Sequence, residues 1–286
     1  MTKRKLGIVV DSTIGGDFGK KIFHDISIVP LTIILDEKSY YEKDLENKVV
    51  FDLLNQNKSL TTSQPNPQLF LKAFKEQLAL GYEHIVCVTI SKKLSGTFNS
   101  AQKAKQILNN PQVNVIDSGS VGPGMLFTLQ KIKQYIETSN PEDYSIMLND
   151  IIKKQSEGKL LFTLNDIKQL IINKRISKIK YFIGQLFKIK PIIKFQEGII
   201  SVEKNLRNWK NIFQYLIKKI VQEQKTLENI EIKIVYVNKD NLAQEFKNEI
   251  EKLKNPKIKI SMYGSISPII AVHLSSDGFG FYLNKI

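Results

Sequence analysis

Short apolar runs alternate with stretches of helical periodicity along most of this chain. The apolar runs are typical of buried strands, and residues three or four apart repeat in the stretches between them. We predict strands over Leu6–Val10, Ile28–Leu35, His84–Ile90, Val113–Asp117, Lys159–Leu164, Ile189–Phe195, Ile230–Val237, Lys257–Met262 and Phe279–Leu283. We predict helices over 46–56, 67–80, 97–109, 121–138, 141–157, 165–173, 208–225 and 240–253. Such alternation favours an α/β protein with largely parallel sheets.

The length of 286 residues fits one large domain or two medium domains. The stretch SEGKLLFTLND contains the predicted break, so we expect an N-terminal α/β domain over 1–160 and a C-terminal α/β domain over 161–286. A helical stripe in the second domain favours a plain core-facing helix over a lipid or partner face. Its apolar members are Leu206, Trp209, Ile212, Phe213, Leu216, Ile217, Ile220 and Val221.

Three early strands end in polar groups, in the segments VVDST, VTISKKLSGT and VIDSGS. In open α/β sheets, ligands bind outside the carboxyl ends of the strands. We therefore expect one shared rim that is formed by Asp11, Ser12, Ser91, Ser95, Asp117 and Ser118.

The chain is strongly basic, with 42 Lys and Arg against 28 Asp and Glu and a net charge of +14. The lysines are scattered over every segment, whereas a nucleic-acid reader favours clustered Arg with interleaved aromatic residues. We therefore expect no nucleic-acid partner, although a basic nucleic-acid-binding module stays an alternative and the charge leaves open a transient contact with a membrane surface.

Targeting and cysteine signals are weak. The N-terminal apolar run is too short for a signal-peptide core, and no stretch approaches the roughly 18–20 apolar residues that span a bilayer. The single Cys87 lies in an apolar run and is interpreted as an inert core thiol. These features predict a soluble, cytoplasmic protein.

Two segments are rich in hydroxyl side chains, TTSQPNP at 61–67 and SKKLSGTFNSA at 91–101. Each can simply be a loop that caps a helix; Ser95 or Thr97 can cap the second helix. A strand, a glycine-containing turn and a helix N-terminus can also bind an anion, because free amides and the positive end of the helix point at it. Together the two turns could hold a phosphate or a carboxylate.

Metal, nucleotide and hydrolase signatures are poor. The three histidines, His24, His84 and His273, are widely spaced, and neither GxxxxGK[ST], GxGxxG nor GxSxG occurs. We therefore expect no metal and no cofactor. His273 can be a structural histidine, or it can pair with Ser95 in a serine acyl-hydrolase, for which no orienting acid is assigned.

Eight segments, in order, span essentially the whole chain: VVDST, IVPLTI, TTSQPNP, ISKKLSGTFNSA, VIDSGSVGPG, KRIS, LFKIKPII and GSISPIIAVH. Taken together, they resemble the DegV family of fatty-acid-binding proteins. The resemblance implies two α/β domains that enclose a long-chain fatty acid in the cleft and interior. It also implies a non-catalytic, lipid-carrying subunit of a fatty acid kinase system that serves phospholipid synthesis, with a separate kinase subunit as partner.

By the same resemblance, Thr62, Ser95 and His273 bind the fatty-acid carboxylate, and Ser63 is a neighbour of this group. Arg175 matches the Arg of the family's GRIS motif and is placed at the pocket rim or a partner contact, in what we interpret as an exposed turn.

The chain departs from the family pattern in two places. NKRIS replaces the usual pair of glycines before the Arg, and LSSDGFG replaces a Gly-Pro-rich segment after the His. Lys adopts a positive φ less readily than Gly, so we expect the mouth of the pocket to be reshaped.

Overall fold

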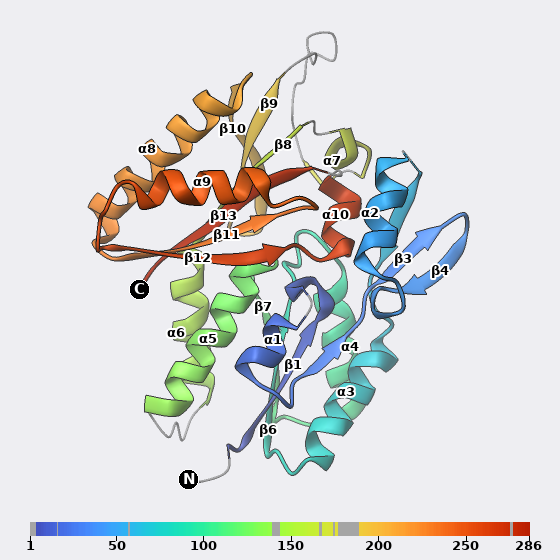
Figure 1. Ribbon diagram of the computed structural model, residues 1–286. Helices are drawn as coiled ribbons and strands as arrows, with labels where there is room; N and C mark the ends of the chain where they lie inside the picture. The colour runs from blue at the N-terminus through green and yellow to red at the C-terminus, as the bar shows by residue number, and fades with distance from the viewer. Residues whose placement is uncertain are drawn as a thin grey trace. The chain divides into compact units, whose positions relative to one another are not determined.

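The protein consists of two units in a computed structural model (Figure 1). The structure describes residues 4–15, 17–56, 58–138, 144–165, 168–173, 175–176, 189–274 and 277–286. The N-terminal unit comprises Met1–Ser156 together with Ser267–Ile269, and the C-terminal unit comprises Glu157–Ile266 with Ile270–Ile286. The chain therefore leaves the second unit, contributes three residues to the first, and returns.

A parallel four-stranded sheet forms the centre of the N-terminal unit, in the order β2-β1-β6-β7. Its strands are β1 (Leu6–Asp11), β2 (Ser27–Val29), β6 (His84–Thr89) and β7 (Val113–Asp117). The parallel arrangement predicted from the alternation is confirmed here. All three neighbouring pairs place the carboxyl ends of their strands on one edge.

Helices cover both faces of this sheet (Figure 1). They are α1 (Phe18–Ile22), α3 (Pro67–Ala79), α4 (Thr97–Leu108), α5 (Pro123–Thr138) and α6 (Tyr144–Ser156). One face packs on α3 and α4, where the buried side chains include Val9, Phe70, Phe74, Cys87, Ala101 and Ala104. Cys87 is fully buried, which confirms it as a core thiol, and burial raises its pKa.

A small antiparallel sheet, ordered β4-β3-β5, completes the N-terminal unit. Its strands are β3 (Thr32–Leu35), β4 (Lys38–Tyr41) and β5 (Leu60–Ser63), and the helical segments nearby in the chain are η1 (Ser12–Ile14), η2 (Glu42–Asp44) and α2 (Asn47–Asn55). The single strand predicted over Ile28–Leu35 is wrong, because Pro30 lacks an amide hydrogen and separates β2 from β3. The first three residues of TTSQPNP, predicted as a helix-capping loop or an anion-binding turn, belong to the strand β5.

The C-terminal unit contains one six-stranded sheet in the order β10-β9-β8-β13-β11-β12. The strands are β8 (Lys159–Leu164), β9 (Lys190–Gln196), β10 (Ile199–Leu206), β11 (Ile230–Tyr236), β12 (Ile258–Ser265) and β13 (Gly278–Lys285). Only β11 and β12 pair in parallel, so the prediction of a largely parallel sheet is wrong here. Glu197 and Gly198 have φ of 50° and 74°, and this two-residue turn folds β9 back onto β10 as a hairpin.

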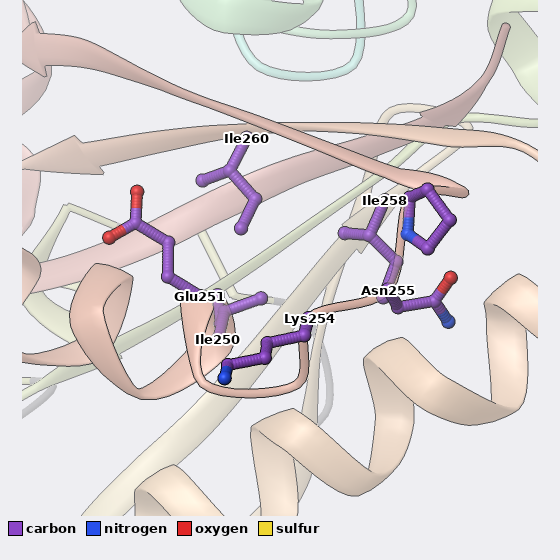
Figure 2. Close-up of a pocket in the computed structure, with 7 residues that line it drawn as sticks. Ile250, Glu251, Lys254, Asn255, Ile258 and Ile260 are labelled. Atoms are coloured by element: carbon purple, nitrogen blue, oxygen red, sulfur yellow. The ribbon is translucent and has the colours of Figure 1, made fainter.

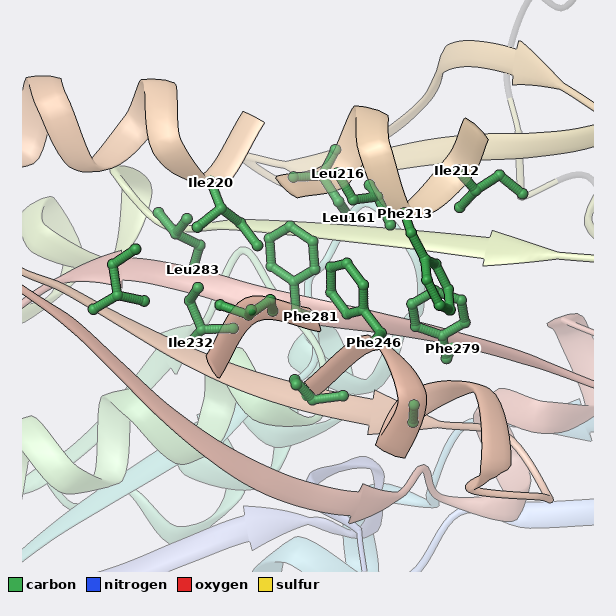
Figure 3. Packing of buried hydrophobic residues seen from close by; sticks show 14 of the residues in the cluster. Leu161, Ile212, Phe213, Leu216, Ile220, Ile232, Phe246, Phe279, Phe281 and Leu283 are labelled. Carbon is green, nitrogen blue, oxygen red and sulfur yellow. The ribbon is translucent and has the colours of Figure 1, made fainter. Parts of the chain in front are cut away.

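Two long helices, α8 (Trp209–Leu227) and α9 (Asn241–Glu251), cover one face of this sheet, and two short helices, α7 (Lys168–Ile172) and α10 (Pro268–Leu274), complete the described elements. Figure 3 shows Phe213, Phe246, Phe279 and Phe281 meeting between α8, α9 and β13. The Phe213 and Phe279 rings lie edge to face with centroids 5.5 Å apart, an arrangement that aromatic pairs favour. The core-facing stripe predicted for α8 is confirmed for all members but Val221, although Leu206 belongs to β10.

No helix in the described parts of the chain is both long and apolar enough to cross a bilayer.

Candidate functional site

Asp11 ends β1 and ties it to the next strand. Its carboxylate accepts hydrogen bonds from the Ile90 amide at 2.6 Å and from the amide and hydroxyl of Thr13 at 3.0 and 2.5 Å. Burial raises the pKa of Asp11 to about 6, although these hydrogen bonds act in the opposite direction. Asp11 therefore holds the loop after β6 against the end of β1.

Asp117, at the end of β7, likewise accepts hydrogen bonds from loop amides. It accepts from the Lys92 amide at 3.1 Å and from the Gly119 amide at 2.9 Å. The Ser91 amide donates to the Ser120 carbonyl at 2.9 Å, which joins the same two loops again. The three strand ends thus meet at one rim, as the sequence predicts.

The Ser95 turn leads directly into α4. The Ser95 hydroxyl accepts from the Thr97 amide at 3.3 Å and is hydrogen-bonded to the Thr97 hydroxyl at 2.8 Å. Gly96 is the N-cap residue of α4 and has no side chain that could accept a hydrogen bond from the first turn. The Ser95 hydroxyl accepts the bond from the Thr97 amide instead. Ser95 is partly buried, so its hydroxyl stands at the beginning of a helix without being sealed in the core.

Thr62 and Ser63 occupy consecutive positions of β5. Thr62 pairs with the buried Ile33, whereas Ser63 pairs with Thr32, and Ser63 lines a surface hollow together with Thr32 and Tyr41. Side chains alternate along a strand, so Thr62 and Ser63 point to opposite faces of the small sheet.

Asn66 caps α3 in the segment that follows β5. Its side chain accepts from the Gln68 amide at 2.9 Å, and Pro67 occupies the first helical turn. The helix cap predicted in this segment is confirmed.

The two hydroxyl-rich turns lie side by side in the N-terminal unit. The Gln64 side-chain amide donates to the Ser100 hydroxyl in α4 at 2.9 Å. The same Gln64 amide lies directly on Gly96, where an added Cβ would collide with it. The sequence analysis did not single out Gln64, because nothing in the sequence indicates which helix lies beside β5.

A buried carboxyl that the sequence analysis missed lies at the same end of the parallel sheet. Glu42 is 8% exposed and its Oε1 accepts from the Ser267 hydroxyl at 2.5 Å. Burial raises the pKa of Glu42 to about 7, although the hydroxyls of Ser12 and Ser267 act against this, and the charge of Asp11 raises it further. The contact joins residues 225 positions apart, so no local pattern could predict it.

His273 and Arg175 belong to the C-terminal unit. His273 lies in α10, and burial, assisted by the positive charge of Arg175, lowers the pKa of His273 to about 4. The imidazole is therefore neutral at physiological pH.

Arg175 follows α7, and its amide donates to the Leu170 carbonyl at 2.9 Å. The side chain is partly buried rather than fully exposed as predicted, and burial lowers its pKa. Lys174, Ser177, Ser275 and Ser276, which belong to the two departures from the family pattern, and residues 186–188 of LFKIKPII lie outside the described residues.

No group of three or more His, Cys, Asp and Glu that could hold a metal ion occurs among the described residues. A separate hollow lies between the end of α9 and the start of β12, lined by Ile250, Glu251, Lys254, Ile258 and Ile260 (Figure 2). It contains none of the residues that the sequence analysis selected, so the hydroxyl-rich rim is the stronger candidate.

A family model described as "Uncharacterised protein, DegV family" matches residues 5–285. The chain belongs to the DegV family. A DegV domain-containing protein of Halalkalibacterium halodurans is 28% identical over 289 residues, which cover 98% of this chain and 99% of the relative. One from Staphylococcus aureus is 29% identical over 287 residues, covering 97% and 98%.

Solved structures share the fold at lower identity. A fatty-acid-binding DegV family protein of Thermus thermophilus superposes with a TM-score of 0.86 at 22% identity, covering 98% of this chain and 99% of that one. A stearic-acid-binding protein of Eubacterium ventriosum gives 0.85 at 22% identity and covers 99% and 98%. DegV of Bacillus subtilis, a fatty-acid-binding protein, gives 0.83 at 22% identity and covers 99% and 100%. The mixed α/β fold predicted from the sequence is thus confirmed as that of DegV proteins.

Proposed function

We propose that this DegV protein binds a long-chain fatty acid and presents its carboxylate, unaltered, to a separate kinase subunit that forms an acyl phosphate for phospholipid synthesis. The observation that carries the proposal is the joining of the Thr62 and Ser95 turns through Gln64. Thr62 in β5 and Ser95 before α4 are both partly buried and belong to the same unit. The named ligands of the DegV relatives, which include stearic and heptadecanoic acids, support a long acyl chain.

The two ends of such a ligand make different demands. Each methylene that leaves water contributes about 0.8 kcal/mol, so the acyl chain supplies most of the affinity. The carboxylate needs hydrogen-bond donors, and hydroxyls at a helix N-terminus provide them without a fixed cation. A head group held in this way stays available to the γ-phosphate of a nucleotide on the kinase.

We assign the head group to Thr62, Ser95 and His273. The neutral imidazole of His273 can donate a hydrogen bond from one ring nitrogen while the other accepts. The alternation along β5 argues against Ser63 as a ligand of the same carboxylate, and we assign Arg175 to the rim that meets the kinase. The carrier needs no cofactor or metal for this task, and its place of action is the cytoplasm.

Extraction of the purified protein with organic solvent, followed by mass spectrometry, tests the proposal. We expect about one long-chain fatty acid per chain, and uptake of added oleate after delipidation. A chain that emerges without lipid and takes up neither oleate nor palmitate would contradict it. Hydrolysis of an added acyl ester that is abolished by Ser95→Ala would instead indicate the serine hydrolase.

A further inference from the structure

We infer that Glu42 is a positioning residue that holds the first residues of α10 in the N-terminal unit and thereby fixes the helix that carries His273. The inference rests on the proposed function for the role of His273, but its structural part can be measured without a ligand. Glu42 itself is not assigned a contact with the fatty acid.

The anchor is built from a buried side chain on each side. The Glu42 amide donates to the Leu31 carbonyl at 3.0 Å, so the residue that starts η2 is fixed beside β3. The Ser267 hydroxyl donates to Glu42 at 2.5 Å and accepts from the Ile269 amide at 3.2 Å. Ser267 is 2% exposed. One hydroxyl therefore connects the carboxyl to the first turn of α10.

The anchor explains why Ser267–Ile269 belong to the N-terminal unit although the residues before and after them do not. α10 begins at Pro268, and His273 follows five residues later on the same helix. A helix is rigid over so short a distance, so the first turn of α10 and His273 move as one piece. Among the described residues, the bond to Glu42 is the one hydrogen bond that the Ser267 hydroxyl makes outside α10.

The second oxygen of Glu42 shows which form of the carboxyl suits this site. Oε2 is buried and has no hydrogen-bond partner among the described residues. Leaving an ionised oxygen unsatisfied is costly, whereas a protonated carboxyl keeps Oε1 as an acceptor for Ser267.

Asp11 is the one other charged group that acts on Glu42 among the described residues, and it also disfavours ionisation. Lys43 and Asp44, the neighbours in η2, are exposed. The anchor therefore holds best with Glu42 neutral and weakens as the pH rises above neutrality.

Three variants separate this role from simple packing: Glu42→Gln keeps an acceptor and cannot ionise, Glu42→Ala removes the acceptor, and Asp44→Asn changes an exposed carboxyl in the same η2 turn. In delipidated protein, hydrogen–deuterium exchange is followed in peptides that cover Ser267–Leu274. Relative to Glu42→Gln, wild type should exchange equally at about pH 6 and faster at about pH 8. Glu42→Ala should exchange faster at both pH values, and Asp44→Asn should behave as wild type.

Binding of cis-parinaric acid by the same proteins supplies the functional readout. Glu42→Ala should weaken binding roughly tenfold, as expected for a lost buried hydrogen bond, and Glu42→Gln should restore it. The comparison at each pH is made with Glu42→Gln, so the titration of the fatty acid cancels.

The inference is overturned if Glu42→Gln exchanges as fast as Glu42→Ala, or if wild type and Glu42→Gln keep the same ratio at both pH values. If the exchange rates follow the expected pattern but wild type binds no fatty acid, the anchor is supported and the proposed function is rejected. Altered exchange in Glu42→Ala with normal binding would reject the link to His273.

Discussion

The side chains that we assign to the head group, Thr62, Ser95 and His273, are all neutral. Ser95 bonds to the first amide of α4, and Thr62 lies on the face of β5 that Ile33 shares. The pKa of His273 is lowered to about 4, so its imidazole adds no positive charge. Arg175 is the cation that acts on His273, and it lies in the same unit. The proposed site would therefore orient the head group without a tight ion pair.

Ser95→Ala should weaken fixation of the head group by about 1–3 kcal/mol, because a buried carboxylate would lose a donor. Most of the affinity comes from the acyl chain, so kinase-dependent phosphorylation should suffer more than fatty-acid binding. A coupled kinase assay beside a fluorescent fatty-acid titration checks this, with the exposed Ser59→Ala as control. Equal phosphorylation by Ser95→Ala and wild type would remove Ser95 from the site.

Arg175→Ala should raise the pKa of His273, since a positive charge that disfavours the imidazolium is removed. Burial, the larger cause, remains, so the pKa should stay below 6.5. Titration of the His273 ring by NMR measures the change, and the exposed Arg207→Ala should leave it unaltered.

The same Arg175→Ala variant should keep near-normal fatty-acid occupancy and lose phosphorylation, because a rim cation acts mainly on encounter with a charged partner. Occupancy is measured by mass spectrometry and turnover with the kinase subunit. If occupancy falls together with turnover, Arg175 contacts the head group; if neither changes, it is a surface residue.

At the scale of elements, the site depends on how closely β5 approaches α4. Gly96 allows this approach because the Gln64 amide occupies the space that a Cβ would need. Gln64 then reaches Ser100, one turn into α4. The glycine in SGT is therefore required for packing, whereas its φ of −73° is one that other residues also adopt.

Gly96→Ala should destabilise the protein by about 1 kcal/mol, because the flexible Gln64 side chain must leave its contact with Ser100. Head-group fixation should fall with it. The double variant Gln64→Ala with Gly96→Ala provides the control: once Gln64 is shortened, the added methyl should cost little. Additive losses of unfolding free energy in urea would show that the two residues do not interact.

Over the whole molecule, burial of acidic groups at the rim makes stability depend on pH. The pKa of Glu42 rises from 4.5 to about 7 and that of Asp11 from 3.8 to about 6. For both groups the folded state binds protons more tightly than the unfolded chain, so their contribution to stability is greatest at low pH and is lost as the pH rises through these intervals.

Glu42→Gln should therefore leave the free energy of unfolding nearly unchanged at about pH 4.5 and increase it by up to about 3 kcal/mol at about pH 8. Urea unfolding at the two pH values measures this difference. Asp44→Asn, whose carboxyl is exposed, is the matched control. A gain in stability that is equal at both pH values would contradict an ionisation effect.

Local patterns in the sequence were sufficient for the features that depend on near neighbours. The βα alternation, the core-facing stripe of α8, the core thiol Cys87 and the shared rim at the ends of β1, β6 and β7 all follow from apolar periodicity and from the position of polar residues after strands. The hydroxyl-rich segments and the DegV resemblance likewise indicate Thr62 and Ser95 from the sequence alone.

The remaining features depended on contacts between distant parts of the chain. β13 runs antiparallel to β8 and β11, which a βα pattern does not predict, because strand direction is set by which strands pair. β4, β5 and β10 carry too many polar residues for an apolar-run criterion. Gln64 and Glu42 look like ordinary polar side chains in the sequence, and only packing against Gly96 and Ser267 makes them part of the site. The sequence alone thus determined the apolar strands, the longer helices and where hydroxyls gather. Tertiary structure decided which residues are desolvated together, because burial and pKa depend on neighbours that the chain brings from far away.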